Sequence, residues 1–267
     1  MSANTVRGAD ARAFIKIFNS ICNWNNPWDR WNDMVHLFAI EIANVFDKKS
    51  AGTRNEQYIR IAKKYTPEEF KGFTDLFNET VMNFEKNPFQ DVLGQMYMEL
   101  DMGSKTHGQC FTPYNVCRMM AECLMDESYI RQRLDEQGWI SITDCACGGG
   151  AMLIAGAERL RELGINYQEK ALFIGQDLDE TVAMMCYIQM SLLGCPGRVR
   201  IGNTLRNPEA CDILLGEGKA NVWYTPMFFS DVWTWRAMLR GVRRTADLAK
   251  KEEISFAKNV QLSFFDR

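Results

Sequence analysis

The chain has 267 residues, of which 46% are hydrophobic and 24% are charged, and its formal net charge is −3. This length allows one full domain and a smaller one, each with a buried core. Apolar runs fall well short of the roughly 20 residues of a membrane-spanning helix, and the first residues open no signal-peptide pattern. We therefore expect a cytoplasmic protein without membrane association, and a charge of −3 indicates no general basic footprint for nucleic acid.

Nine cysteines and two histidines invite the question of a metal site. Cys145 and Cys147 are separated by one residue, and no C-x-x-C pair completes a finger-like ligand set. We expect no metal and interpret the cysteines as buried or loop thiols of a reduced compartment. His36 lies on an apolar helix face and is interpreted as structural, and His107 is interpreted as a solvated loop residue in preference to a general base.

The first hundred residues are typical of helices. Apolar residues recur at spacings of three and four over 11–24, 28–46 and 56–64. The residues T-P-E-E at 66–69 predict a capping box, and Asn87-Pro88 predicts a second helix start of the same kind. We therefore expect a helical N-terminal domain over residues 1–105.

Three tryptophans, Trp24, Trp28 and Trp31, stand close together in this helical region. Exposed aromatic rings at such a place can stack on nucleic-acid bases. Packing at a corner between two helices explains the same residues and is favoured here.

Residues 139–164 read as a buried strand, a tight glycine turn and a helix. Ile140 and Ile142 alternate with polar residues before Asp144 closes the strand, and C-A-C-G-G-G at 145–150 then turns into a helix. Glycines let the backbone approach a ligand closely, and the first amides of the helix point at it. No G-x-G-x-x-G occurs, which disfavours a pyrophosphate-binding loop. A plain glycine-rich turn is the alternative.

A second apolar run, at 171–174, leads to the acidic residues Asp177 and Asp179. In a parallel sheet its carboxyl end lies beside the first loop, where the acidic side chain meets a ribose diol. The two strand ends together predict one nucleoside site. A helix over 180–193 and a short third strand over 199–201 follow.

Four short motifs stand in order along residues 88–208: G-Q-C-F-T-P at 108–113, D-C-A-C-G-G-G at 144–150, G-Q-D-L-D at 175–179 and G-N-T-L at 202–205. Together they resemble the S-adenosylmethionine site of adenine-specific DNA methyltransferases, most closely the modification (M) subunits of type I restriction systems. The resemblance implies an α/β fold, with a Rossmann-like S-adenosylmethionine-dependent methyltransferase core over residues 106–230, behind the helical N-terminal domain.

The resemblance also implies roles for single residues. Thr112 and Pro113 are expected near the methionine moiety, and Asp144 near its charged groups. Asp177 is expected to bind the ribose hydroxyls, and the amide oxygen of Asn203 to accept a bond from the adenine amine. The complete set of expected cofactor-binding residues is Phe111, Thr112, Pro113, Asp144, Ala146, Gly148, Gly150, Asp177, Leu178 and Asn203.

The family pattern fails at the methyl acceptor. Transfer to an exocyclic amine needs acceptors that hold the amine in plane and a ring stacked on the extruded base, which the family supplies as [NDS]-P-P-[YFW]. No such tetrapeptide occurs here. L-G-E-G at 215–218 and Y-T-P-M at 224–227 occupy its place, and Tyr224, Thr225 and Pro226 are the weak catalytic candidates.

Residues 231–267 are predicted to form a C-terminal helix, over 231–258, and a tail. Arginines on one side of the helix, among them Arg236 and Arg240, fit either a phosphate-contacting strip or a solvated face. The tail residues Gln261, Leu262, Phe264 and Phe265 resemble the peptide by which bacterial proteins hold the replication sliding clamp. A tail that folds back onto the core is the alternative.

We therefore predict an S-adenosylmethionine-dependent, adenine-specific DNA methyltransferase-like protein, similar to a type I M subunit. DNA and a specificity or other methylase subunit are its expected partners, and activity is expected to need such a partner. The missing tetrapeptide leaves enzymatic activity of the chain alone open. The alternative is a catalytically inactive adaptor that binds S-adenosylmethionine or associates with DNA.

Overall fold

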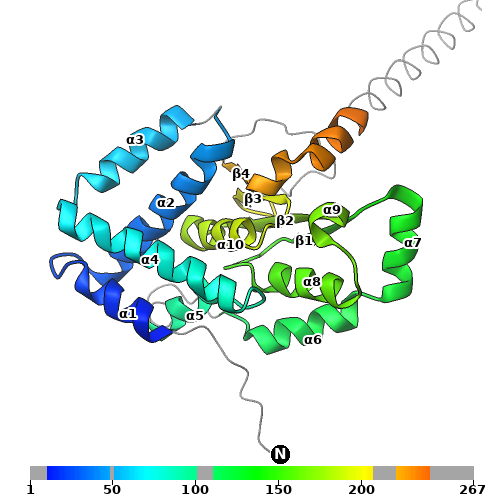
Figure 1. Ribbon diagram of the computed structural model, residues 1–267, viewed down its shortest axis with the longest axis horizontal. Helices are drawn as coiled ribbons and strands as arrows, with labels where there is room; N and C mark the ends of the chain where they lie inside the picture. The colour runs from blue at the N-terminus through cyan, green and yellow to red at the C-terminus, as the bar shows by residue number, and fades with distance from the viewer. Residues whose placement is uncertain (1–10, 49–50, 101–110, 207–220, 241–267) are drawn as a thin grey trace, which may run out of the picture.

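Five helices build the N-terminal half of the protein in the computed structural model, which describes residues 11–48, 51–100, 111–206 and 221–240 (Figure 1). They are α1 (Ala11–Ser20), α2 (Pro27–Phe46), α3 (Ala51–Ala62), α4 (Pro67–Lys86) and α5 (Val92–Glu99). The predicted helical character of this region is confirmed. The first helix ends before residue 24, and the next begins at the Asn26 cap with Pro27 in its first turn.

The predicted capping box at the start of α4 is confirmed. The Thr66 hydroxyl accepts a bond from the Glu69 amide at 3.2 Å, and the Glu69 carboxylate accepts one from the Thr66 amide at 2.8 Å. These reciprocal bonds satisfy two amide groups that have no partner within the helix itself. The helix therefore begins where its local sequence specifies.

The predicted helix start at Asn87-Pro88 is wrong. Asn87 ends α4, and α5 begins five residues later at Val92, behind an Asp91 cap that accepts a bond from the Gly94 amide at 2.9 Å. The reason is the side-chain amide of Gln90, which donates to the carbonyls of Asn83 and Asn87 at 2.9 and 2.8 Å. Gln90 thus closes the carboxyl end of α4 and bends the chain before the next helix.

The second half alternates strands and helices. Its elements are α6 (Tyr114–Leu124), α7 (Glu127–Gln137), β1 (Ile140–Asp144), α8 (Ala151–Glu162), α9 (Tyr167–Lys170), β2 (Ala171–Asp177), α10 (Glu180–Leu192), β3 (Gly197–Ile201), β4 (Val222–Tyr224) and the 3₁₀ turn η1 (Pro226–Phe229). Helical residues 231–240 follow, so the predicted C-terminal helix is confirmed over its described part, and the rest of it lies outside the described residues.

The described strands form one sheet in the order β1-β2-β3-β4. β1, β2 and β3 are parallel, whereas β4 is antiparallel to β3, and Asp144 lies opposite Gly175 in the register. The carboxyl ends of β1 and β2 therefore lie side by side at one end of the sheet, where a doubly wound sheet binds its ligand. Within the described residues β1 is an edge strand. The predicted α/β fold with a Rossmann-like core is confirmed.

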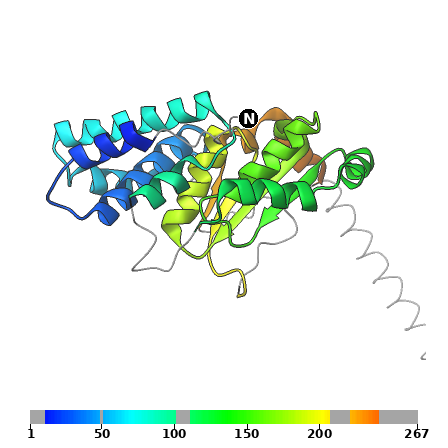
Figure 2. The ribbon, with the colours of Figure 1, turned by 90° about the horizontal axis from the view of Figure 1, so that it is seen from below.

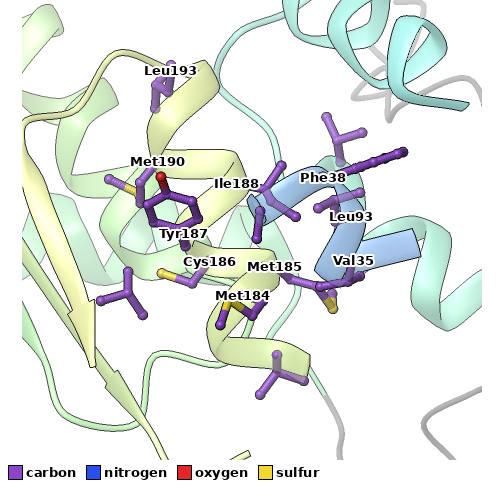
Figure 3. Packing of buried hydrophobic residues seen from close by; sticks show 14 of the residues in the cluster. Val35, Phe38, Leu93, Met184, Met185, Cys186, Tyr187, Ile188, Met190 and Leu193 are labelled. Carbon is purple, nitrogen blue, oxygen red and sulfur yellow. The ribbon is translucent and has the colours of Figure 1, made fainter. Parts of the chain in front are cut away.

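Helix α10 lies between the sheet and the N-terminal helices (Figures 1 and 2). Ten of its thirteen residues are buried, which is the pattern of a helix covered on all sides. Figure 3 shows Met185 and Ile188 directed toward Val35, Phe38 and Leu93 of the N-terminal half. Residues on both sides of the expected boundary at 105 thus share one core, and the boundary itself lies outside the described residues.

The tryptophan cluster is divided by the fold. Trp31 is fully buried, with its ring 5.6 Å from that of Tyr97, as the packing interpretation expects. Trp24 is 57% exposed and leans on Tyr65. Among the described helices, none is long and apolar enough to cross a membrane.

Candidate functional site

The glycine turn after β1 adopts a backbone that favours glycine at two positions. Gly148 and Gly150 have φ angles of +50° and +95°, in the left-handed region. At Gly150 a Cβ atom would also lie 2.9 Å from the Cys186 sulfur, so α10 packs directly behind the turn. The turn therefore brings the first amides of α8 to the carboxyl end of β1.

Asp177, the last residue of β2, is tied to this turn by its carboxylate. One oxygen accepts a bond from the Gly148 amide at 2.8 Å, and the other from the Asp179 amide at 3.0 Å. Each carboxylate oxygen can accept about two hydrogen bonds, so these contacts orient the group and leave acceptor capacity on both oxygens. The side chain is half-buried and lines a cavity in front of the turn.

Asp144, the last residue of β1, places a second carboxylate at the same cavity. Burial, and to a smaller degree the charge of Asp177, raises the pKa of Asp144, although a bond from the Ala146 amide at 3.1 Å opposes this. Two neighbouring carboxylates favour a cation between them, because its charge offsets both the desolvation and the repulsion. The site is therefore electrostatically suited to a cationic ligand.

The cavity itself measures about 310 Å³, near the lower end of the range for small-ligand pockets. Phe111 and Thr112 form the wall opposite the turn, and a Cβ atom at Gly148 would lie 3.3 Å from the Phe111 ring. That ring packs in turn on Tyr97 of α5, with 5.3 Å between ring centroids. A residue of the N-terminal half thus supports one wall of the site from behind.

Six of the ten residues expected from the sequence line this cavity: Phe111, Thr112, Asp144, Ala146, Gly148 and Asp177. Pro113, Gly150, Leu178 and Asn203 do not. Pro113 is the cap residue of α6, Gly150 belongs to the turn but faces Cys186 of α10, and Leu178 is 69% exposed. The Asn203 oxygen already accepts bonds from the Leu205 and Arg206 amides at 2.9 and 3.1 Å, so both of its lone pairs are occupied.

The cavity also has lining residues that the motifs did not single out: Cys117, Cys147, Gly149, Ala151, Met152 and Val182. Four of them lie inside the glycine turn or the first turn of α8, so their place follows from the motif itself. Cys117 of α6 and Val182 of α10 carry no local signal. A hydrogen bond with Cys186 and burial raise the pKa of Cys147 well above its ordinary value, so this thiol stays neutral.

The catalytic candidates Tyr224, Thr225 and Pro226 lie elsewhere. The Thr225 hydroxyl accepts a bond from the Gly197 amide at 2.9 Å and donates to the Cys195 carbonyl at 2.7 Å. Gly197 begins β3, so these residues sit at the opposite end of the sheet from the glycine turn. The structure does not bring them together with the cofactor-type cavity, and the other candidate segment, 215–218, lies outside the described residues.

One arginine of the C-terminal helix, Arg236, makes contacts within the fold. The Arg236 guanidinium donates to the carbonyls of Glu169 and Gly138 and lies over the Trp233 ring, at 4.5 Å from its centroid. Burial lowers the pKa of Arg236. Arg236 therefore anchors the helix and is not part of a free phosphate-contacting surface. The clamp-like tail lies outside the described residues.

Of the two histidines, His107 lies outside the described residues and His36 is buried. The Nδ1 atom of His36 is 2.8 Å from the Asn32 carbonyl, and Nε2 is 3.4 Å from the Glu180 carboxylate. Burial alone would lower the pKa of His36, but the bonds to Glu180 and Asn32 and the nearby carboxylates raise it overall. His36 thus joins α2 to the first residue of α10, which is a structural role.

A glycine turn beside the acidic carboxyl ends of two parallel strands is typical of nucleotide-binding α/β proteins. The family described as N-6 DNA Methylase matches residues 89–263, well over half of the chain. The chain therefore belongs to the N-6 DNA methylase family, which confirms the resemblance carried by the four motifs.

Individual relatives are more distant. The type I restriction enzyme MjaIX methylase subunit of Methanocaldococcus jannaschii is 25% identical over 149 residues, which cover 54% of this chain and 24% of that protein. The chain thus spans about a quarter of the length of this relative. Its name agrees with the expected similarity to type I methylase subunits.

Two solved structures resemble the chain distantly. One is a type I restriction-modification methyltransferase subunit from Streptococcus thermophilus, with a TM-score of 0.38, 21% identity, and coverage of 55% of this chain and 30% of that one. The other is a putative class I S-adenosylmethionine-dependent methyltransferase from Listeria monocytogenes, with a TM-score of 0.41, 12% identity, and coverage of 77% and 57%.

Proposed function

We propose that this chain is the S-adenosylmethionine-binding part of an adenine-specific DNA methyltransferase of the type I kind. The observation that supports it most is the cavity at the carboxyl ends of β1 and β2 in a chain of the N-6 DNA methylase family. When bound, S-adenosylmethionine supplies the methyl group. The chain's own residues bind and orient it.

The proposed binding mode assigns each part of the ligand to a group of matching chemistry. The ammonium and sulfonium charges fit the carboxylate of Asp144, whose raised pKa a bound cation would lower. The ligand carboxylate fits the first amides of α8, where the helix dipole favours negative charge. The ribose hydroxyls fit the remaining acceptor positions of Asp177.

The methyl acceptor site is proposed to need a partner subunit. Among the described residues, the weak candidates Tyr224, Thr225 and Pro226 lie at the wrong end of the sheet. β1 is an edge strand there, whereas the doubly wound order flanks the first strand on both sides. We propose that another methylase subunit extends the sheet at β1 and supplies the groups that hold the adenine amine.

Two further proposed partners follow from the family. DNA is the proposed substrate, and a specificity subunit is proposed to select the sequence that is methylated.

A sliding clamp is proposed as a partner from the resemblance of the tail to a clamp-binding peptide, with Gln261, Leu262, Phe264 and Phe265 as the contacts. A synthetic peptide of residues 259–267 should bind a bacterial clamp with a dissociation constant in about the micromolar range, because few side chains are buried. The matched peptide with Leu262 and Phe265 replaced by alanine should not bind.

The test of the function has two stages. Calorimetric titration of the full chain with S-adenosylmethionine and with its demethylated product should give saturable one-site binding. Incubation with labelled S-adenosylmethionine and duplex DNA should then give little or no incorporation until a partner methylase subunit is added. Absence of any binding would contradict the cofactor proposal. Robust adenine methylation by the chain alone would contradict the need for a partner.

A further inference from the structure

A buried side-chain amide joins the N-terminal helices to the glycine turn. Gln189 of α10 is fully buried, and its Nε2 group donates to the Gly149 carbonyl and to the Asp91 carboxylate, both at 2.7 Å. Its Oε1 atom accepts a bond from the Leu93 amide at 3.0 Å. Both polar atoms of the Gln189 side chain therefore have partners. Asp91 and Leu93 precede Gln189 by 98 and 96 residues, and Gly149 precedes it by 40.

The contact at Gly149 acts on the geometry of the turn. The Gly149 carbonyl and the Gly150 amide belong to one planar peptide unit. Gln189 holds the carbonyl, and the Cys147 carbonyl accepts from the Gly150 amide at 2.8 Å. Both the carbonyl and the amide of this peptide unit are thus fixed by hydrogen bonds. Because glycines turn freely about φ and ψ, this double hold restricts a turn that the backbone alone would leave adaptable.

Asp91 fixes the position of the Gln189 amide in turn. Its Oδ1 atom accepts from Gln189 and also from the Gly94 amide at 2.9 Å, where it caps α5. A Cβ atom at Gly94 would lie 2.0 Å from the Asp91 carboxylate, so the glycine leaves room for this cap. Burial raises the pKa of Asp91. Both bonds end on one oxygen, so an asparagine retains the same two acceptor contacts.

We infer that Gln189 and Asp91 are positioning residues, which hold the glycine turn in its ligand-binding shape and make cofactor affinity depend on the N-terminal helices. Neither residue lines the cavity of the candidate site. The inference rests on the proposed function for the identity of the ligand, S-adenosylmethionine. The mechanical link between α5, α10 and the turn stands on the hydrogen bonds alone.

The test compares Gln189→Met with Ile188→Ala, its neighbour on α10. Methionine keeps the length of the side chain and removes both donors and the acceptor. Ile188 is fully buried against the N-terminal helices, so its truncation weakens the same packing and leaves the Gly149 contact in place (Figure 3). Both variants should melt at lower temperature. At a temperature where both remain folded, Gln189→Met should bind the demethylated cofactor about tenfold more weakly, the effect of roughly one hydrogen bond.

The conservative pair at position 91 gives a second arm. Asp91→Asn should bind like the unmodified chain, because the retained oxygen still accepts from Gln189 and Gly94. Asp91→Ala should bind more weakly than Asp91→Asn, and less weakly than Gln189→Met, since the Gly149 contact survives. Equal affinity of Gln189→Met and Ile188→Ala would overturn the inference, because their shared loss of packing would then explain both.

Amide hydrogen exchange of the free protein provides a readout that does not depend on the cofactor. Exchange in residues 148–152 should become faster in Gln189→Met and stay unchanged in Ile188→Ala. If the unmodified chain bound no cofactor and exchange still changed in this way, the proposed function would fail and the link would stand. Unchanged exchange in Gln189→Met would reject the link itself.

Discussion

The two ends of the sheet use polar groups in opposite ways. At the carboxyl ends of β1 and β2, Asp144 and Asp177 each bond to backbone amides and still face a cavity. At the other end, where β3 begins, the Thr225 hydroxyl donates to the Cys195 carbonyl and accepts from the Gly197 amide. Thr225 is 1% exposed. Unused acceptor capacity, and not the presence of a polar motif, therefore distinguishes the proposed ligand site from the buried Thr225.

The largest expected effect on cofactor affinity comes from removing a carboxylate at the carboxyl ends of β1 and β2, called here the open end of the sheet. Asp177→Ala should weaken binding of S-adenosylmethionine by about 1.5–3 kcal/mol, the range for hydrogen bonds to a charged group. The variant loses the proposed ribose acceptor and also the partner of the Gly148 amide. Calorimetric titration measures the change in affinity. Unaltered affinity would show that Asp177 does not bind the cofactor.

Removal of a polar group at the opposite, closed end of the sheet, where Thr225 lies, should lower stability instead of affinity. Thr225→Val keeps the shape of the side chain and leaves the Gly197 amide and the Cys195 carbonyl without their hydroxyl partner. We expect the free energy of unfolding to fall by about 1–2 kcal/mol, within the range for a buried unsatisfied group. Denaturant unfolding measures this, while cofactor affinity should stay as in the unmodified chain. A large loss of affinity in Thr225→Val would break the contrast between the two ends.

The smallest expected effect is on the pH dependence of stability, and it concerns the ion pair between His36 of α2 and Glu180 of α10. The pKa of His36 is raised in the folded protein, so its ion pair contributes fully below the unfolded pKa of about 6.5 and is lost as the pH rises through the folded value. The pKa of Glu180 is lowered, chiefly by the hydrogen bond from His36, so its contribution is lost as the pH falls through that value.

The measurement compares melting of the unmodified chain with His36→Gln at pH 6 and pH 8.5. The difference between the two proteins should be larger at pH 6, and small in absolute terms because Glu180 is more than half exposed. Asp33 also raises the pKa of His36, so its attraction to the protonated ring adds to the difference between the two proteins in the same direction. A difference that grows toward pH 8.5 would contradict the ion pair.

Local sequence determined the parts of the protein whose physics is local. The capping box at Thr66, the apolar alternation of β1 and the glycines that need a positive φ each act within a few residues, so their pattern is readable along the chain. The order of the four motifs predicted the family, and three of the motifs stand at the carboxyl ends of β1, β2 and β3. These features sufficed for the fold class and for most of the cavity wall.

Only the tertiary structure decided where distant polar groups meet. Gln189 and Asp91 are 98 residues apart, and no spacing along the chain indicates that they share a bond. The strand pairing of β4 with β3 placed Tyr224 far from the glycine turn, although Y-T-P-M occupies the place of the acceptor motif along the chain. The Asn203 oxygen was likewise taken by a local turn. A side chain's type is written in the sequence, but its free hydrogen-bonding capacity depends on every neighbour that folding brings to it.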